Sequence, residues 1–420
     1  MDGKALLQGE VAVSVPPSWS GRVGPGRPDT MTNSFCGGSR RAGMELTEEQ
    51  RAIHDVVREF AVEEVRPGAR ERDREQTFPE EVWNALADLD LTGLTVPEEY
   101  GGLDADRVTY SVANEELAYG SLSVATALSV HCLATSCIAT FGDADQRERW
   151  LPEMVDGRPV GAFALSEPHA GSNPRAMTTE ARRDGDEYVV DGKKQWITNG
   201  TRAGVAVLFA KTDRDDDDTV TQFLVPTDTP GVSVGTKEDK LGLRASDTAT
   251  LVFEGARVPV ENRLTEVGRG LSAAFSILTG GRVGIASQAV GLAQAALDEP
   301  REYAGEREQF DRQLDEIQTI RHKLAEMHAR VKAGRLLTRD AARRLEAGDP
   351  QDAAQAASVA KYVASENAMD VTNEALQIHG GYGYVSEYDV ERFYRDAKIT
   401  TIYEGTTEIQ KEIVARHLLD

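Results

Sequence analysis

The chain has 420 residues, 40% of them hydrophobic and 28% charged, which is typical of a globular protein with two or three domains. Its formal net charge of −23 argues against a nucleic-acid partner, because phosphate binding needs a basic face. No apolar run reaches the roughly 18–20 residues that cross a bilayer. Residues 124–139 come nearest, but Ser, Thr and His interrupt them, so we predict a buried helix and no membrane partner.

Lysine supplies only 11 of the 47 basic residues. This balance suggests a cytoplasm of high salt, where carboxylates stay hydrated and their mutual repulsion is screened; an ordinary acidic cytoplasmic enzyme is the alternative. The three cysteines, Cys36, Cys132 and Cys137, fit neither a disulfide framework nor the spacing of metal ligands. We therefore expect no metal and place Cys132 and Cys137 in the core.

Residues 1–43 differ in composition from the rest of the chain. They hold four prolines and eight glycines, carry a net charge of +2 and lack a signal-peptide pattern, so we predict a disordered extension. Met44 is a candidate for the true start. Residues 44–159 have helical periodicity and predict an N-terminal α-helical domain, which Thr47 and Gln50 open with a capping box.

The pattern changes to strands over residues 160–268, which predict a small middle β-domain. Turn signals at 184–185 and 191–192 indicate two hairpins between alternating segments. The acidic run 213–218 predicts a solvated loop between two strands, with a cation site as a remote alternative.

Helical periodicity returns over residues 269–420, which predict a C-terminal four-helix bundle. Pro300 is expected to end or kink its first helix. The predicted fold class is therefore α+β and mostly α: a helical domain, a small β-domain and a helix bundle, in that order.

Two segments of the middle domain suit a planar ligand. A strand ending at Leu165-Ser166 and followed by a Pro-Gly turn offers free backbone N–H groups, although a plain interdomain loop is the alternative. Further on, Trp196 and Thr198 share one face of a strand, with Ile197 on the other face. An indole and a hydroxyl on one face suit an isoalloxazine ring; the alternative is a tryptophan of the hairpin core.

A lone carboxylate, Glu404, lies next to Gly405 near the C-terminus, after a basic segment. The alternative to a catalytic role is an acidic residue that begins the last helix. With the segments ALSEPHAGSN (164–173) and QIHGGYGY (377–384), the segment YEGT (403–406) closely resembles the acyl-CoA dehydrogenase family of flavoenzymes. The resemblance covers nearly all of residues 45–420 and includes the predicted domain order.

The resemblance implies FAD as cofactor and assigns residues to it and to the substrate. Glu404 is implied to be the catalytic base, and Gly281, which stands where other family branches carry the base, cannot act as one. Substrate contacts are implied for Ser172, Arg282, Tyr403 and Gly405. FAD contacts are implied for Phe163, Leu165, Ser166, Ser172, Trp196, Ile197, Thr198, Arg307, Phe310, Gln318, Gln377, Gly380, Gly381, Thr406 and Glu408.

Several positions depart from the family pattern. Asn173 replaces an aspartate, Asp311 a glycine and Gln313 a proline, and Glu408 stands where the family often has glutamine. The departures at 311 and 313 put the geometry of this loop in doubt more than the implied FAD contact of Arg307. Alternatives to cofactor binding are a surface ion pair for Arg307, a helix stop for the glycines 380–381 and a helix-end ion pair for Arg282.

The function implied by the resemblance is FAD-dependent α,β-dehydrogenation of an acyl-CoA thioester to the trans-2-enoyl-CoA. Glu404 removes the α-proton, and the hydride goes to flavin N5. Electron-transfer flavoprotein is the expected acceptor, a homotetramer built as a dimer of dimers the expected assembly, and fatty-acid β-oxidation the expected context. The motifs look most like those of short-chain and branched-chain members.

The rival functions are a flavin-dependent monooxygenase or an oxidase on the same fold, and a non-catalytic flavoprotein relative. Glu404 disfavours the monooxygenase, which typically lacks the base. A substrate that carries a carboxylate would need a basic group deep in its pocket, for which Arg107 is a candidate.

Overall fold

The structure is a computed structural model that describes residues 45–419. The predicted disordered extension, with Cys36, and the proposed start at Met44 lie outside the described residues. The described residues belong to one compact unit.

The first part of the described chain is helical, as predicted. The capping box is confirmed: Gln50 N donates to Thr47 Oγ1 and Thr47 N donates to Gln50 Oε1, both at 3.1 Å. The α-helices are α1 (Glu48–Phe60), α2 (Ala69–Glu75), α3 (Glu80–Asp88), α4 (Arg107–Gly120), α5 (Leu122–Phe141) and α6 (Ala144–Val155).

Helix α5 is the core helix of this part. It is long and apolar enough to cross a bilayer, but nearly all of its side chains are buried within the fold, as predicted for this segment. Cys132 and Cys137 are buried there with free thiols, which confirms their expected place in the core.

The middle of the chain forms one seven-stranded sheet. Strand β4 pairs in parallel with β1 and β2 and antiparallel with β5. Beyond β2, the strands β3, β7 and β6 follow as antiparallel neighbours. The strands are β1 (Gly161–Ala164), β2 (Glu180–Asp184), β3 (Glu187–Thr198), β4 (Val205–Lys211), β5 (Val220–Pro226), β6 (Val232–Lys237) and β7 (Thr248–Pro259).

Only the first of the two predicted hairpin turns forms. Residues 184–187 join β2 to β3, but β3 runs straight through Asp191-Gly192 and pairs with β7 on both sides of that point. The prediction of a second turn was wrong because Gly192, at a φ of 156°, lies at a register shift in the pairing of β3 with β7 and not in a turn. A second register shift falls between Lys194 and Ile197, where Trp196 has a φ of 64°.

The last part of the chain is a bundle of long helices. It comprises α7 (Gly270–Glu306), α8 (Gln318–Ala347), α9 (Pro350–His379), α10 (Val390–Thr400) and α11 (Thr407–Leu419). Pro300 does not end α7, which continues to Glu306, because a proline removes only one intrahelical hydrogen bond and neighbouring helices pack along α7. Arg282 lies inside α7. The helix-end position considered for it from the sequence is therefore wrong.

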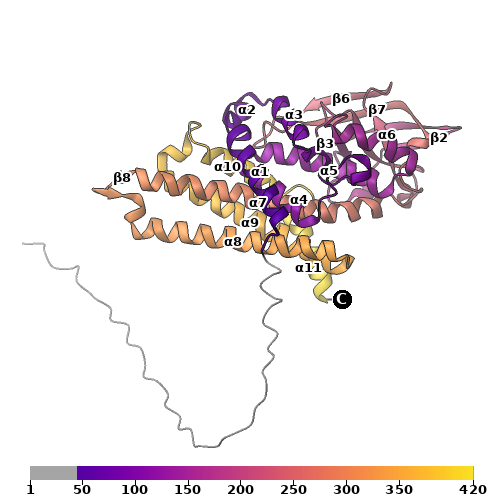
Figure 1. Cartoon of the computed structure of the whole chain (residues 1–420). Helices are drawn as coiled ribbons and strands as arrows, with labels where there is room; N and C mark the ends of the chain where they lie inside the picture. The colour runs from indigo at the N-terminus through magenta and orange to yellow at the C-terminus, as the bar shows by residue number, and fades with distance from the viewer. Residues whose placement is uncertain (1–44, 420) are drawn as a thin grey trace, which may run out of the picture. The chain divides into compact units, whose positions relative to one another are not determined.

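A short hairpin of β8 (Glu308–Gln309) and β9 (Arg312–Gln313) connects α7 to α8. Figure 1 shows β8 at one end of the bundle and the seven-stranded sheet at the other. Three hydrophobic clusters hold these layers together: one unites the N-terminal helices with the bundle, one joins α5 and α6 to the sheet, and one lies within the sheet.

Candidate active site

Glu404 lies in a left-handed turn between α10 and α11. Its φ is 51° and that of Gly405 is 94°, conformations that need outside support for a residue with a side chain. Two buried side chains supply it: Lys361 Nζ donates to Gly405 O at 2.8 Å, and Gln410 Nε2 donates to Glu404 O and Gly405 O at 3.2 and 3.0 Å. The turn is thus fixed by hydrogen bonds from α9 and α11.

The side chain of Glu404 is half-buried. Its Oε2 atom is buried and has no hydrogen-bond partner within residues 45–419. Burial raises the pKa of Glu404 to about 7, against the opposing charges of Lys361 and Arg282, which lower it. A carboxylate with such a pKa is a competent proton acceptor near neutral pH.

Helix α7 presents two residues to this carboxyl group. A Cβ atom at Gly281 would overlap Glu404 Oε2, so the absence of a side chain is what leaves room for the carboxylate. The next residue, Arg282, is 9% exposed, and its Nε has no partner within the described residues. The structure therefore brings Glu404, Gly281 and Arg282 together, and Arg282 is not the helix-end ion pair considered as its alternative.

Sequence reasoning missed the residues that hold Glu404 in place. Lys361 is fully buried and is the only lysine of α9. The sequence could have indicated this role, because helical spacing puts Lys361 on the same face as the buried Ala357 and Ala364. A lysine on an apolar helix face needs a specific partner. The Tyr403 hydroxyl donates to Gln288 Oε1 at 3.2 Å, an anchor on α7 that no local pattern indicated.

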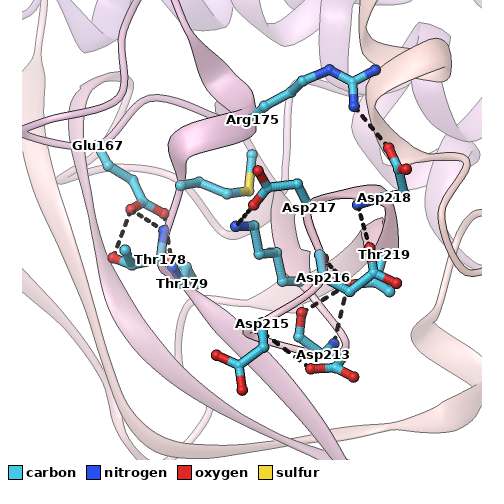
Figure 2. A network of polar contacts seen from close by, with 12 residues as sticks. Glu167, Arg175, Thr178, Thr179, Asp213, Asp215, Asp216, Asp217, Asp218 and Thr219 are labelled. Carbon is cyan, nitrogen blue, oxygen red and sulfur yellow. Dashed lines mark hydrogen bonds and ion pairs between the residues drawn. The ribbon is translucent and has the colours of Figure 1, made fainter.

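The segment that follows β1 is tied down by a buried ion pair. Lys194 Nζ lies 2.8 Å from Glu167 Oε1 and donates to Leu165 O at 3.0 Å, and both side chains are almost completely buried. Glu167 also accepts hydrogen bonds from Thr178 and Thr179 (Figure 2). Burial alone would raise the pKa of Glu167, but the charge and hydrogen bond of Lys194 bring it to about 2.

The acidic loop 213–218 forms ion pairs with basic side chains of the same chain. Figure 2 shows Arg175 reaching Asp218, at 2.8 Å, and the turn from Asp213 to Thr219 closing on itself by hydrogen bonds. Asp217 pairs with Lys211. Within residues 45–419 the structure has no group of three potential ligands suited to a metal ion.

The predicted flavin-facing residues of the middle domain lie at the surface of the sheet. Trp196 is 58% exposed in its left-handed conformation, and Thr198 and Ser166 are half-buried. Phe163 and Leu165 are also half-buried, and Ser172 is exposed. The Ile197 side chain instead packs in the sheet core, so only its backbone could face a cofactor.

A second group of predicted cofactor residues lies at the end of the bundle that carries the β8–β9 hairpin. Arg307, Gly380 and Gly381 line one cavity of about 720 Å³, and a Cβ at either glycine would meet open space. Gly380 ends α9, so the helix-stop alternative describes its backbone without excluding a ligand contact. Gln318 and Gln377 are exposed, and Phe310 is 85% exposed at the hairpin tip.

The hairpin tip explains one departure from the family pattern. Phe310 and Asp311 both have φ near 60°, which is the geometry of a type I′ turn. Asp311 adopts the backbone that a glycine would take, so this loop keeps its form without one. Thr406 and Glu408 begin α11, where Thr406 Oγ1 accepts from Ile409 N at 3.4 Å and Glu408 is exposed.

These observations fit a flat, phosphate-bearing cofactor. An exposed indole beside a hydroxyl suits a planar ring, and a guanidinium above open glycine backbone suits phosphate oxygens. The first group lies on the sheet and the second lines a cavity beside β8, and Figure 1 shows the sheet and β8 at opposite ends of the fold, so one copy alone does not bring the two groups into one cavity.

Comparison with known proteins agrees with this geometry. Models of the N-terminal, middle and C-terminal domains of acyl-CoA dehydrogenase match residues 47–158, 162–256 and 268–419. The chain therefore belongs to the acyl-CoA dehydrogenase family, which is a family of FAD-dependent oxidoreductases.

Individual relatives match over most of their length. The mitochondrial short-chain specific acyl-CoA dehydrogenase of Rattus norvegicus is 44% identical over 90% of this chain and 91% of its own. The structure of butyryl-CoA dehydrogenase from Megasphaera elsdenii has a TM-score of 0.87 at 40% identity, covering 90% of this chain and 99% of the other. A chain in a structure of the electron transferring flavoprotein of Acidaminococcus fermentans has a TM-score of 0.87 at 39% identity, covering 89% and 99%.

Proposed function

We propose that this acyl-CoA dehydrogenase oxidises a short acyl-CoA to the trans-2-enoyl-CoA with Glu404 as the base. The observation that carries the proposal is the buried, unpartnered Oε2 atom of Glu404, in a carboxyl group whose pKa of about 7 leaves it ionised in a large fraction of molecules near neutral pH. A base that removes a proton next to a thioester needs this position and this pKa.

Bound FAD supplies the hydride acceptor for the substrate β-carbon, and the residues of the chain supply the rest. Glu404 takes the α-proton through its unpartnered Oε2 and becomes neutral. The Glu404 backbone N–H donates to no acceptor within the described residues, so it is free to bind the thioester oxygen as negative charge develops there. Lys361 holds the turn that orients both groups.

Arg282 has a supporting place in this scheme. Its buried guanidinium and the Lys361 ammonium leave two positive charges around one carboxylate. These charges favour the ionised form of Glu404 before proton transfer and oppose the cost of burying it. Tyr403 and Gly405 flank the base and are proposed to contact the acyl thioester, with Ser172 toward the CoA side.

The assembly is proposed to be a homotetramer, a dimer of dimers in which each FAD contacts two subunits. The support is that Trp196 and Thr198 belong to β3 of the sheet, whereas Arg307, Gly380 and Gly381 line a cavity beside β8. The sheet and β8 lie at opposite ends of the fold (Figure 1). The exposed Phe310 and the 91% exposed Tyr384 add apolar surface next to the second group.

The electron acceptor is proposed to be an electron-transfer flavoprotein and the substrate a short-chain acyl-CoA. The first rests on the similarity to the Acidaminococcus chain, and the second on the similarity to the rat and Megasphaera enzymes. A cytoplasmic location and a role in fatty-acid β-oxidation remain proposals that follow from the sequence and the family.

The decisive experiment is anaerobic mixing of the purified holoenzyme with butyryl-CoA. The flavin absorbance of the wild-type enzyme should bleach, and the Glu404→Gln variant should retain its flavin and bleach at least about 1,000-fold more slowly, because the amide cannot accept the proton. Bleaching of Glu404→Gln at the wild-type rate would refute the assignment of the base. Rapid reoxidation of the reduced enzyme by air would indicate an oxidase instead.

A further inference from the structure

We infer that Arg107 binds a carboxylate at the far end of the acyl group, so that the preferred substrate is a short acyl-CoA with an anionic terminus. This inference rests on the proposed function and deepens it by naming the substrate class. It is carried by a cavity that runs from the base to an unpaired guanidinium.

The cavity is bounded by Gly281 and Leu133 at the end nearest the base. Gly281 lies directly against Glu404 Oε2, and Leu133 packs on the same side. The volume is about 180 Å³, below the roughly 300–1,000 Å³ of pockets that bind drug-sized ligands. A chain of that size is a short acyl group and not a fatty one.

The lining of this cavity is unusually polar for a hydrocarbon site. Apolar acyl chains are held by apolar walls, whereas here hydroxyl, thiol and guanidinium groups stand among a few aliphatic side chains. The polar residues of the lining are Thr95, Arg107, Tyr110, Cys132, Ser136, Thr140 and Ser276.

Arg107 has no structural partner that accounts for its charge. Its single contact with a carboxylate in residues 45–419 uses the backbone, where N–H donates to Glu346 Oε2 at 3.0 Å. The side chain begins α4, and a cation in the first turn of a helix opposes the helix dipole. Asp106 already caps that helix by accepting from Thr109 N. The guanidinium therefore costs stability where it lies.

The route from the base to Arg107 is open along α7. Gly280 has no side chain, and a Cβ there would come to 3.7 Å from an Arg107 guanidinium nitrogen. Tyr110 lies between the two ends: the pKa of its hydroxyl is raised by burial and by the charge of Glu404, and lowered by Arg107. A carboxylate three carbons beyond the α-carbon would reach the guanidinium while the α-carbon stays at Glu404.

The chemistry of the step is unchanged. The α-proton passes to Glu404, the hydride leaves the β-carbon, and the two electrons pass to the bound FAD of the proposed function. A hydrocarbon tail in the same cavity would cover part of the half-buried Arg107 guanidinium without pairing its charge, which disfavours such a substrate.

The test compares two acyl groups of nearly the same shape, glutaryl-CoA and 5-methylhexanoyl-CoA. For the wild-type holoenzyme, kcat/KM for glutaryl-CoA should be at least about tenfold higher, as expected for one charge-assisted contact. Arg107→Gln should lower the glutaryl value about 10- to 100-fold and leave the other within threefold. Arg107→Lys should recover part of the loss, and the exposed Arg182→Gln, which removes the same charge elsewhere, should change neither.

Binding without turnover gives a second readout. In the Glu404→Gln background, titration calorimetry should show the same loss of glutaryl-CoA affinity on adding Arg107→Gln. Equal affinity and equal kcat/KM for the two compounds, unaffected by Arg107→Gln, would overturn the inference while leaving the dehydrogenase intact. Failure to oxidise either compound, or butyryl-CoA, would refute the proposed function itself.

Discussion

Glu404 is a residue whose chemistry depends on its neighbours. Burial pushes its pKa up to about 7, and the charges of Lys361 and Arg282 keep it from going higher. The same glutamate at the surface would remain near its ordinary pKa, too weak a base for an α-proton. We therefore expect burial and the two buried cations together to set the pH range of the proposed reaction.

Replacing Lys361 should shift the pH dependence of the reaction. Because ionised Glu404 is the active form, the rate of flavin reduction should rise with pH through about 7 in the wild type. Lys361→Met removes a charge that lowers the pKa of Glu404, so the rising limb should move to higher pH. A pH–rate profile of the anaerobic half-reaction measures this.

Lys332, exposed on α8, provides the control for that experiment. Lys332→Met removes the same charge far from the base and should leave the limb unmoved. An unchanged limb in Lys361→Met would show that Lys361 acts only through its hydrogen bond to Gly405.

Lys194 is a second residue with a large expected effect. Lys194→Met leaves Glu167 buried without its cation, and breaking such a pair costs about 3–5 kcal/mol. It also removes the donor to Leu165 O, so the variant should release flavin faster. Urea unfolding and flavin dissociation rates test both effects.

The adjacent Lys193 is exposed and offers a matched comparison. Lys193→Met should change the free energy of unfolding by less than about 0.5 kcal/mol. Equal urea midpoints for the two variants would mean that the buried pair adds nothing to stability.

At the scale of an element, helix α7 makes room for the candidate active site because positions 280 and 281 carry no side chain. Two glycines in a helix interior cost about 1 kcal/mol each relative to alanine, yet α7 keeps both at the point where it passes Glu404 and Arg107. The helix gives up stability there for space.

The two glycines predict opposite results for the same substitution. Gly281→Ala should raise helix stability but displace the Glu404 carboxyl group, so flavin reduction by butyryl-CoA should fall about tenfold or more. Gly280→Ala meets its nearest atoms at an ordinary 3.7 Å and should retain most activity. Stopped-flow reduction of both variants decides the matter, and equal rates would contradict the steric argument.

At the scale of the whole molecule, the distribution of cofactor residues is the main feature. Trp196 lies on the sheet, and Arg307 lies where α7 gives way to the hairpin at the far end of the bundle. A symmetric dimer can bring the first group of one subunit to the second group of its partner.

Complementation between two defective chains tests that arrangement. Trp196→Ala and Arg307→Gln homo-oligomers should each bind FAD weakly. Co-expressed and randomly assembled, about a quarter of the sites should be intact, because half of the pairs are mixed and each mixed pair has one undamaged site. FAD occupancy after gel filtration measures this, and no recovery would place each site within a single chain.

The sequence predicted much of the fold because its periodicities are long and strong. The helical periodicity read over residues 269–420 appears as the long helices α7, α8 and α9, and the Thr47–Gln50 capping box is confirmed. Local signals failed where tertiary pairing overrode them: Asp191-Gly192 has turn chemistry but lies in a continuous strand, and Pro300 lies inside a helix that packing sustains.

The sequence by itself determined the family and the order of helices and strands, and it predicted Glu404 as the base, because each of these is written in contiguous residues. The tertiary structure decided how that base is tuned and what bounds its pocket. Lys361, Arg282, Gly281 and Arg107 come from three helices, and only the packing of those helices around Glu404 sets the charges and the space near it. Burial and distance are properties of the folded chain, which no local pattern encodes.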